Sequence, residues 1–387
     1  MVHPFAGCKY ALVLAVVAVW PFTGCVSPTA LHHAVLAYDR SVERVTSEQL
    51  LLNIIRARFY QPLHFTKVSS VAATFDFRVS AGIAPPEGDA RGLVGPLFSA
   101  TAAENPTVTI IPIDGEEFTT RLLTPLDERR FLKLLEVGAD IGMALQMAAS
   151  SLRIQTGAGT VVYLNDPGRP DEYEQFQRRV RHLASLYDEH RLHIDPVMSE
   201  EAWIGTLPAG LAPEDVLAAL DKGYKWKSAG GEGYRLNRMR ILIANYRPHE
   251  VNDAVRQELA DRLREWPPND ILVDIRPGFP GGEIPMTGQI TLRSFNSVLE
   301  FLARVAREFT GHQLDSTRLL TIEESERELQ NAAVSVRYGD RYYGIRKPAP
   351  DRPGEVRNAK AFGMLSQLFQ MMVQPVNVPV PGIAIAK

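Results

Sequence analysis

Cysteine is nearly absent from this chain of 387 residues, which contains only Cys8 and Cys25. Both lie near the N-terminus, so the rest of the chain cannot form an internal disulfide and must be held together by its core. After residue 25 there is no apolar run of about 18 residues, the length that indicates a membrane-spanning helix. We also find no repeat with a period of about 20–50 residues, which excludes a solenoid.

An excess of basic residues is absent as well. Lys and Arg number 42 and Asp and Glu number 45, which gives a formal net charge of −3. Proteins that bind nucleic acid usually carry a strongly basic surface, so the composition does not favour nucleic acid as a partner. The hydrophobic content of 45% and charged content of 22% are ordinary for a globular protein. The length allows one large domain or two smaller ones.

The N-terminus has the order of features that is typical of an export signal. Lys9 supplies a weak positive charge, and an unbroken apolar run follows over residues 10–20. The small residues Thr23 and Gly24 then precede Cys25. The apolar run is shorter than the roughly 20 residues that a membrane-spanning helix needs, which favours a cleaved secretory signal.

Thr23-Gly24-Cys25 resembles the lipobox of bacterial lipoproteins, although Phe22 stands where that motif usually has Leu. The resemblance implies that the Cys25 thiol receives a diacylglyceryl group and that the chain is cut between Gly24 and Cys25. A simple cleaved signal and an uncleaved anchor are the alternatives. We therefore predict a signal peptide over 1–24 and a short lipidated tether over 25–29. Val26, which is not Asp, favours sorting to the outer membrane.

The remaining residues, 30–387, predict an α+β fold of mixed, mainly antiparallel sheet with packed helices after an N-terminal helix. Apolar spacing predicts a helix over 30–60 and a clear amphipathic helix over 295–309. Strand patterns follow at 65–79 and in a hairpin over 332–345, while the Gly- and Pro-rich stretch 81–106 predicts a loop insertion. Helices and strands do not alternate steadily, which argues against a doubly wound sheet.

Three stretches resemble an uncharacterised family of bacterial lipoproteins. They are residues 48–66, which begin Glu48-Gln-Leu-Leu-Leu-Asn-Ile-Ile-Arg-Ala-Arg58, residues 122–135, and a region from Arg293 to Phe369. The resemblance supports export and lipidation. It implies no activity and supplies no catalytic residue.

Asn53, Arg56 and Arg58 are polar residues in an otherwise apolar helix segment. Because Arg is seldom buried without a partner, these residues indicate either a polar network or a contact with a partner protein. The alternative is that their aliphatic stems pack on the core while the polar ends reach solvent. His64 follows nearby and is more typical of a capping residue than of a base.

Three further groups contain residue types used in catalysis or metal binding. Residues 188–195 hold two His and three acidic residues, which form either a metal site or the solvated end of a helix. His312, Asp315 and Ser316 are adjacent in sequence, whereas the members of a catalytic triad usually come from distant segments. The Gly-rich residues 230–233 lack the Lys-Ser/Thr of a phosphate-binding loop and predict a hairpin. We assign no catalytic residue, metal or cofactor.

The sequence thus predicts the cellular location of the protein more clearly than its activity. Our leading hypothesis is a lipid-anchored protein of the cell envelope that binds or scaffolds another envelope protein without catalysis. It would contact the membrane through the lipid on Cys25. The alternative is a lipid-anchored periplasmic hydrolase whose site is assembled from dispersed residues. A deep pocket with converging polar side chains would favour the enzyme, and an exposed binding surface would favour the binder.

Overall fold

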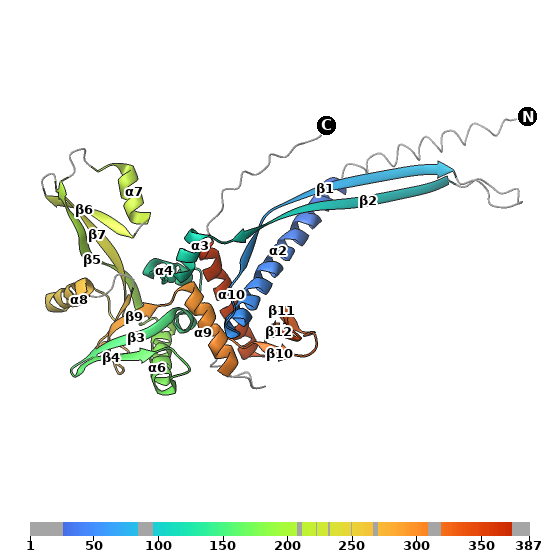
Figure 1. The fold of residues 1–387 in the computed structure, drawn as a ribbon. Coiled ribbons are helices and arrows are strands. Elements are labelled where there is room, and N and C mark those ends of the chain that lie inside the picture. Colours follow the sequence, from blue (N-terminus) through green and yellow to red (C-terminus); the bar gives the residue numbers. More distant parts are fainter. Residues whose placement is uncertain are drawn as a thin grey trace, which may run out of the picture. The chain divides into compact units, whose positions relative to one another are not determined.

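The structure is a computed structural model that describes residues 26–83, 96–206, 211–221, 223–230, 233–248, 250–265, 270–308 and 319–373. The predicted signal and Cys25 lie outside these residues. The chain divides into two compact units, which we describe separately (Figure 1). The first comprises Met1–Gln49, Phe65–Ile113 and Val376–Lys387, and the second comprises Leu50–His64 and Asp114–Pro375.

The described part of the first unit contains most of helix α2 (Val26–Arg58) and a long antiparallel hairpin. Strands β1 (Phe65–Ile83) and β2 (Pro96–Ile113) pair along their full length, from Phe65 opposite Ile113 to Ile83 opposite Pro96. The predicted helix over 30–60 is confirmed. The helix also passes through residues 46–49 without a break, and the Thr46 hydroxyl donates to the Val42 carbonyl at 2.9 Å inside it.

Residues 26–29 of the predicted lipidated tether begin α2, and the tether itself stays a prediction. One sequence prediction for this part of the chain is wrong. The predicted loop over 81–106 is shorter, since 81–83 belong to β1 and 96–106 to β2. Continuous pairing between the strands satisfies the backbone groups there and outweighs the weak strand preference of the Ala and Pro residues.

The second unit is built on a mixed sheet (Figure 1). Among the described strands, β7 (Gly233–Ala244) and β8 (Ile271–Ile275) pair in parallel. The other neighbouring strands pair antiparallel. One of them, β6 (Tyr224–Gly230), pairs with β7 but lies outside the linear strand order given next. The remaining strands, in spatial order, are β4 (Gly159–Leu164), β3 (Ala149–Thr156), β9 (Met286–Leu292), β8 (Ile271–Ile275), β7 (Gly233–Ala244) and β5 (His193–Thr206).

Helices and a small three-stranded sheet complete the second unit. The small sheet has the order β10 (Glu323–Ser325), β12 (Arg341–Arg346) and β11 (Ala332–Tyr338). The helices are α3 (Glu116–Leu123), α4 (Glu128–Glu136), α5 (Ile141–Ala148), α6 (Pro170–Asp188), α7 (Pro213–Asp221), α8 (Asp253–Glu265), α9 (Phe295–Glu308) and α10 (Pro353–Met372). None of the described helices is both long enough and apolar enough to cross a membrane.

The predicted α+β class is confirmed, as are the amphipathic helix near 295–309 and the hairpin near 332–345. Gly339 occupies the hairpin turn with a φ of 62°, a conformation that glycine adopts without strain. Thr124 ends α3, and Asp127 caps α4 by accepting from the Arg130 N–H at 2.7 Å.

The end of α2 is a packing element of the second unit, as its sequence predicts. Leu50, Leu51, Ile54 and Ile55 are all fully buried, whereas Leu52 is half-buried. We expect Ile55→Ala to lower the free energy of unfolding by about 3 kcal/mol, because a methyl-lined cavity replaces close packing. Leu52→Ala removes a side chain of the same size from a partly solvated site and should cost clearly less. Urea denaturation of both variants checks this, and equal losses would contradict it.

Candidate functional site

An open groove of about 790 Å³ lies on the second unit, between the end of α2 and the helix α9. Its walls are the last turn of α2, the connection that follows it, and one face of α9. The residues that line it are Ala57, Arg58, Tyr60, Gln61, Pro62, Leu63, Asn296, Glu300, Ala303 and Arg304.

A second hollow of about 380 Å³ adjoins this groove, because Glu300 and Arg304 line both. It includes hydroxyl and amide side chains at the start of α9 and near the ends of β3 and β4, among them Ser150, Asn165 and Ser297. We call the two hollows together the α9 groove. Its surface combines hydroxyl, amide and charged groups with apolar side chains, among them Pro62, Leu63 and Leu164.

Two of the three Arg side chains that line the α9 groove, Arg58 and Arg304, are paired with carboxylates, and the third, Arg293, is bonded to carbonyl oxygens. Arg304 lies 3.3 Å from Asp166, and Arg58 lies 3.2 Å from Glu324. The Glu300 carboxylate accepts from the Asn296 amide at 2.7 Å. Because each of the two Arg side chains has a carboxylate partner, the groove does not present a strong field of one sign.

Arg293 is buried beneath the second hollow and fixes the start of α9. Its guanidinium donates to the carbonyl oxygens of Met147, Ala149 and Asn165, and it lies 3.8 Å from the centre of the Phe301 ring. Burial lowers the pKa of Arg293 to about 9. These contacts connect α9 to β3 and to the residue after β4, so they hold the walls of the hollow in a defined arrangement.

Tyr60 lines the groove with its side chain 86% exposed, and its backbone has a φ of 58°. It follows the end of α2 in a Schellman motif, in which the Gln61 N–H donates to the Arg56 carbonyl at 2.8 Å and the Tyr60 N–H to the Ala57 carbonyl at 3.2 Å. Glycine usually occupies this left-handed position, since other residues are strained there. Tyr60 is thus held at the groove in an unfavourable backbone conformation.

Of Asn53, Arg56 and Arg58, the predicted partner contacts, the first two form an internal polar network and Arg58 pairs with Glu324. Asn53 is fully buried; its side-chain amide donates to the His64 carbonyl at 2.8 Å and its oxygen accepts from the His64 N–H at 2.9 Å. Arg56 donates to the same oxygen at 3.4 Å. Asn53 therefore cannot contact a partner, because its polar groups hold the connection 59–64 against α2. Of the three residues, only Arg58 lines the groove.

We expect Asn53→Ala to lower the free energy of unfolding by about 1–3 kcal/mol, because the His64 N–H and C=O lose their partners and a cavity replaces the fully buried Asn53 side chain. Hydrogen exchange should also speed up over residues 59–64. Asn296→Ala is the matched control, since its amide bonds a carboxylate at the surface. If Asn296→Ala loses as much stability as Asn53→Ala, the hydrogen bonds between Asn53 and the His64 backbone make no specific contribution.

The other sequence candidates do not assemble into a site. Within the described residues, no group of three or more His, Cys, Asp or Glu side chains is placed to hold a metal ion, so the metal-site interpretation of 188–195 is wrong. Glu189 instead pairs with Arg191 at 3.1 Å, as expected at a solvated helix end. Gly230 pairs with Gly233, which confirms the predicted hairpin. His312, Asp315 and Ser316 lie outside the described residues.

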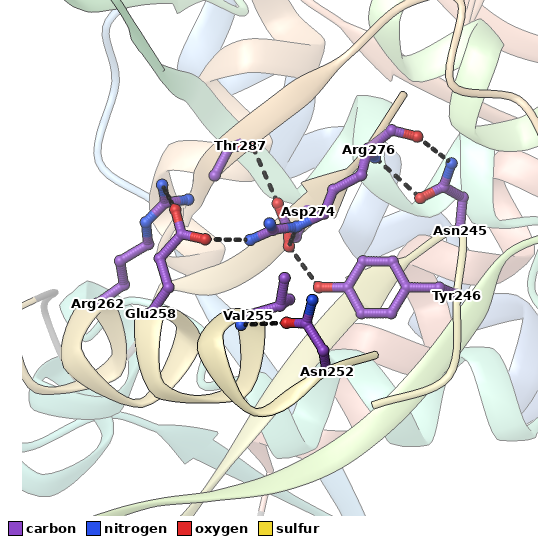
Figure 2. A network of polar contacts seen from close by, with 9 residues as sticks. All are labelled: Asn245, Tyr246, Asn252, Val255, Glu258, Arg262, Asp274, Arg276 and Thr287. Atoms are coloured by element: carbon purple, nitrogen blue, oxygen red, sulfur yellow. Dashed lines mark hydrogen bonds and ion pairs between the residues drawn. The ribbon is translucent and has the colours of Figure 1, made fainter. Parts of the chain in front are cut away.

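A dense polar network joins α8 to the ends of the parallel strands β7 and β8 (Figure 2). The buried carboxylate of Asp274 accepts from the Tyr246 hydroxyl, from Arg276 at 2.6 Å and from Thr287 at 2.9 Å. Arg276 also donates to Glu258 on α8 at 2.8 Å. Burial raises the pKa of Tyr246, and the Asp274 carboxylate raises it further. Asp274 is held by three donors, so its role here is to join the three elements.

A second buried cluster joins α4 to β7. Arg240 Nε lies 2.5 Å from a carboxylate oxygen of Glu128, and its guanidinium also donates to the Asp270 carbonyl at 2.7 Å. The other Glu128 oxygen accepts from the Ile241 N–H. Burial raises the pKa of Glu128 to about 7, although the positive charge of Arg240 opposes the shift.

This shift predicts a pH dependence of stability. The pKa of Glu128 is raised from 4.5 to about 7, so the unfolded chain loses its proton first as the pH rises. The contribution of Glu128 is therefore fully present below pH 4.5 and falls as the pH rises toward 7. Denaturation of the wild type and of Glu128→Gln should show that the free energy of unfolding of the wild type, relative to that of the variant, decreases from pH 4.5 to about 7. A constant difference would contradict the raised pKa.

Comparison of this chain with known protein families, characterised proteins and solved structures finds no match. The likeness to an uncharacterised family of lipoproteins therefore stays a prediction. The α9 groove is a feature that the sequence did not predict, because its walls come from segments more than 230 residues apart.

Proposed function

We propose that this chain is a lipid-anchored protein of the bacterial cell envelope, and that it binds another envelope component through the α9 groove without catalysing a reaction. The order of Lys9, the apolar run 10–20 and Thr23-Gly24-Cys25 supports the anchor. Val26 supports the outer membrane as its destination.

The α9 groove is the observation that carries the binding role. It is large enough for a sizeable ligand, and it is open along the surface instead of enclosing a small molecule. Its lining includes an exposed Tyr and two Arg, residue types that often contribute strongly to recognition. Its walls are fixed by Asn53 and Arg293, so the binding surface is formed before the partner arrives.

The anchor is tested by intact-mass measurement of the protein from membranes. The wild-type chain should begin at Cys25 and carry added acyl mass, and Cys25→Ser should lack that mass and accumulate uncut. Membrane fractionation should place the wild type in the outer membrane. A mature chain that begins at any other residue would overturn the anchor, and recovery with the inner membrane would overturn the destination.

The binding role is tested with a photo-activatable side chain in living cells. Placed at the exposed Gln61 in the groove, it should crosslink a defined envelope component. The same side chain at Leu217, which is 66% exposed on α7, is the matched control. Equal crosslinking to the same component from both positions would show that the groove does not direct binding.

A further inference from the structure

We propose that the α9 groove binds a polymer of N-acetylated amino sugars, the chemistry of the glycan strand in peptidoglycan. The inference rests on the proposed function, because the envelope location is what brings such a polymer within reach. It names the chemical class of the component that the groove recognises.

The shape of the groove fits an elongated ligand. The two hollows, of about 790 and 380 Å³, share Glu300 and Arg304 in their linings and therefore lie side by side. Sites for small metabolites enclose most of the ligand surface, whereas this groove is open along its length. A chain of several sugar units can lie in such a groove and still extend beyond both ends.

The chemistry of the lining fits a sugar. The Gln61 and Asn296 amides can both donate to and accept from sugar hydroxyls and acetamido groups, and the Ser150 hydroxyl, which donates to the Thr291 carbonyl, can accept. The ring of Tyr60 adds an exposed aromatic face on which the C–H groups of a pyranose can pack. This pairing of a flat ring with neutral polar groups suits a ligand that is amphipathic and rich in hydroxyls.

The electrostatics and the secondary structure disfavour the other polymers. Arg58 and Arg304 are already paired with Glu324 and Asp166, so a polyanion would meet no unbalanced positive field. A peptide added as a strand needs an open sheet edge, and the walls of the larger hollow are helix and connection.

The backbone at Tyr60 is an independent argument that its side chain has a role. The same Schellman motif ends α6, where His190 has a φ of 57° and the Arg191 N–H donates to the Leu186 carbonyl at 2.8 Å. Glycine would relieve the strain at either position. Tyr60 keeps a large ring at a position that favours glycine, and strained residues of this kind are often found at ligand sites.

The two positions provide a matched experiment on the full lipidated chain in detergent. Chitohexaose, a soluble hexamer of N-acetylglucosamine, is the probe for calorimetric binding, and cosedimentation with purified sacculi is the second readout. We expect Tyr60→Gly to weaken both by about 10-fold or more. Its melting temperature should stay within about 2 °C of wild type or rise, because the strain is relieved. His190→Gly relieves the same strain outside the groove and should leave binding unchanged.

Several results would overturn the inference. These are wild-type protein that binds neither probe, Tyr60→Gly with unchanged affinity, equal weakening in His190→Gly, or sacculus binding that isolated stem peptides compete away while chitohexaose does not. If Cys25 carries its lipid and Gln61 crosslinks a protein, any of these results leaves the proposed function standing and removes only the glycan as ligand. If Cys25 carries no lipid but chitohexaose still binds, the anchor fails and the groove chemistry stands.

Discussion

Glu128→Ala is expected to lower the free energy of unfolding by about 3–5 kcal/mol at pH 7 or above, because it leaves Arg240 buried without its carboxylate. Arg240 is fully buried, and unlike Glu128 it cannot become neutral at accessible pH. Its contacts to the carbonyls of Leu263 and Asp270 remain, but they do not neutralise its charge. Urea or thermal denaturation at pH 7.5 measures the loss.

The control replaces both partners at once. Glu128→Leu combined with Arg240→Met removes both charges and keeps the volume, so most of the stability should return. Glu128→Gln keeps an acceptor for Arg240 and should fall between the wild type and Glu128→Ala. If the double variant is as unstable as Glu128→Ala, packing and not charge explains the loss.

Asp274→Ala is expected to cost about 3–5 kcal/mol as well, because it removes the acceptor shared by Tyr246, Arg276 and Thr287 (Figure 2). The Tyr246 hydroxyl would remain in a buried site without this partner, and Arg276 would lose one of its two carboxylate partners and keep Glu258. The backbone amide hydrogens of α8 should then exchange faster with solvent, since the network no longer holds the helix to β8.

Glu258→Ala is the control for this second prediction. Glu258 pairs with Arg276 and Arg262, but its side chain is 42% exposed, so water can replace most of what is lost. We expect a loss below about 1 kcal/mol. If Glu258→Ala is as unstable as Asp274→Ala, the network acts through its exposed ion pairs and not through the buried carboxylate.

The two buried clusters and the α9 groove have different roles in the second unit. The clusters around Asp274 and Arg240 join helices to the sheet and use up their own polar groups. In the groove, Gln61 and Tyr60 are exposed, and the residues that position the walls are buried behind it. A partner would therefore meet a formed surface without disturbing the core.

The elements that the sequence predicted well are those whose apolar spacing is local. Apolar residues recur three and four positions apart over residues 31–45 and on the buried face of α9, so α2 and α9 could be located from the sequence alone. The hairpin of β11 and β12 was equally local, because Gly339 supplies the turn. The export signal and Cys25 are also a local pattern, and they stay a prediction from sequence.

The tertiary structure decided everything that depends on pairing between distant segments. Ala149 begins β3 directly after the helix α5, because β3 pairs with β9 more than 130 residues later in the chain. Asn53 looked like a partner contact, and only its position opposite the His64 backbone shows that its polar groups are already used. Nothing in the sequence pointed to Tyr60. A helix end of this kind is normally recognised by a glycine, and here Tyr60 occupies the glycine position. The α9 groove exists only where α9 meets the end of α2, so no local pattern could reveal it.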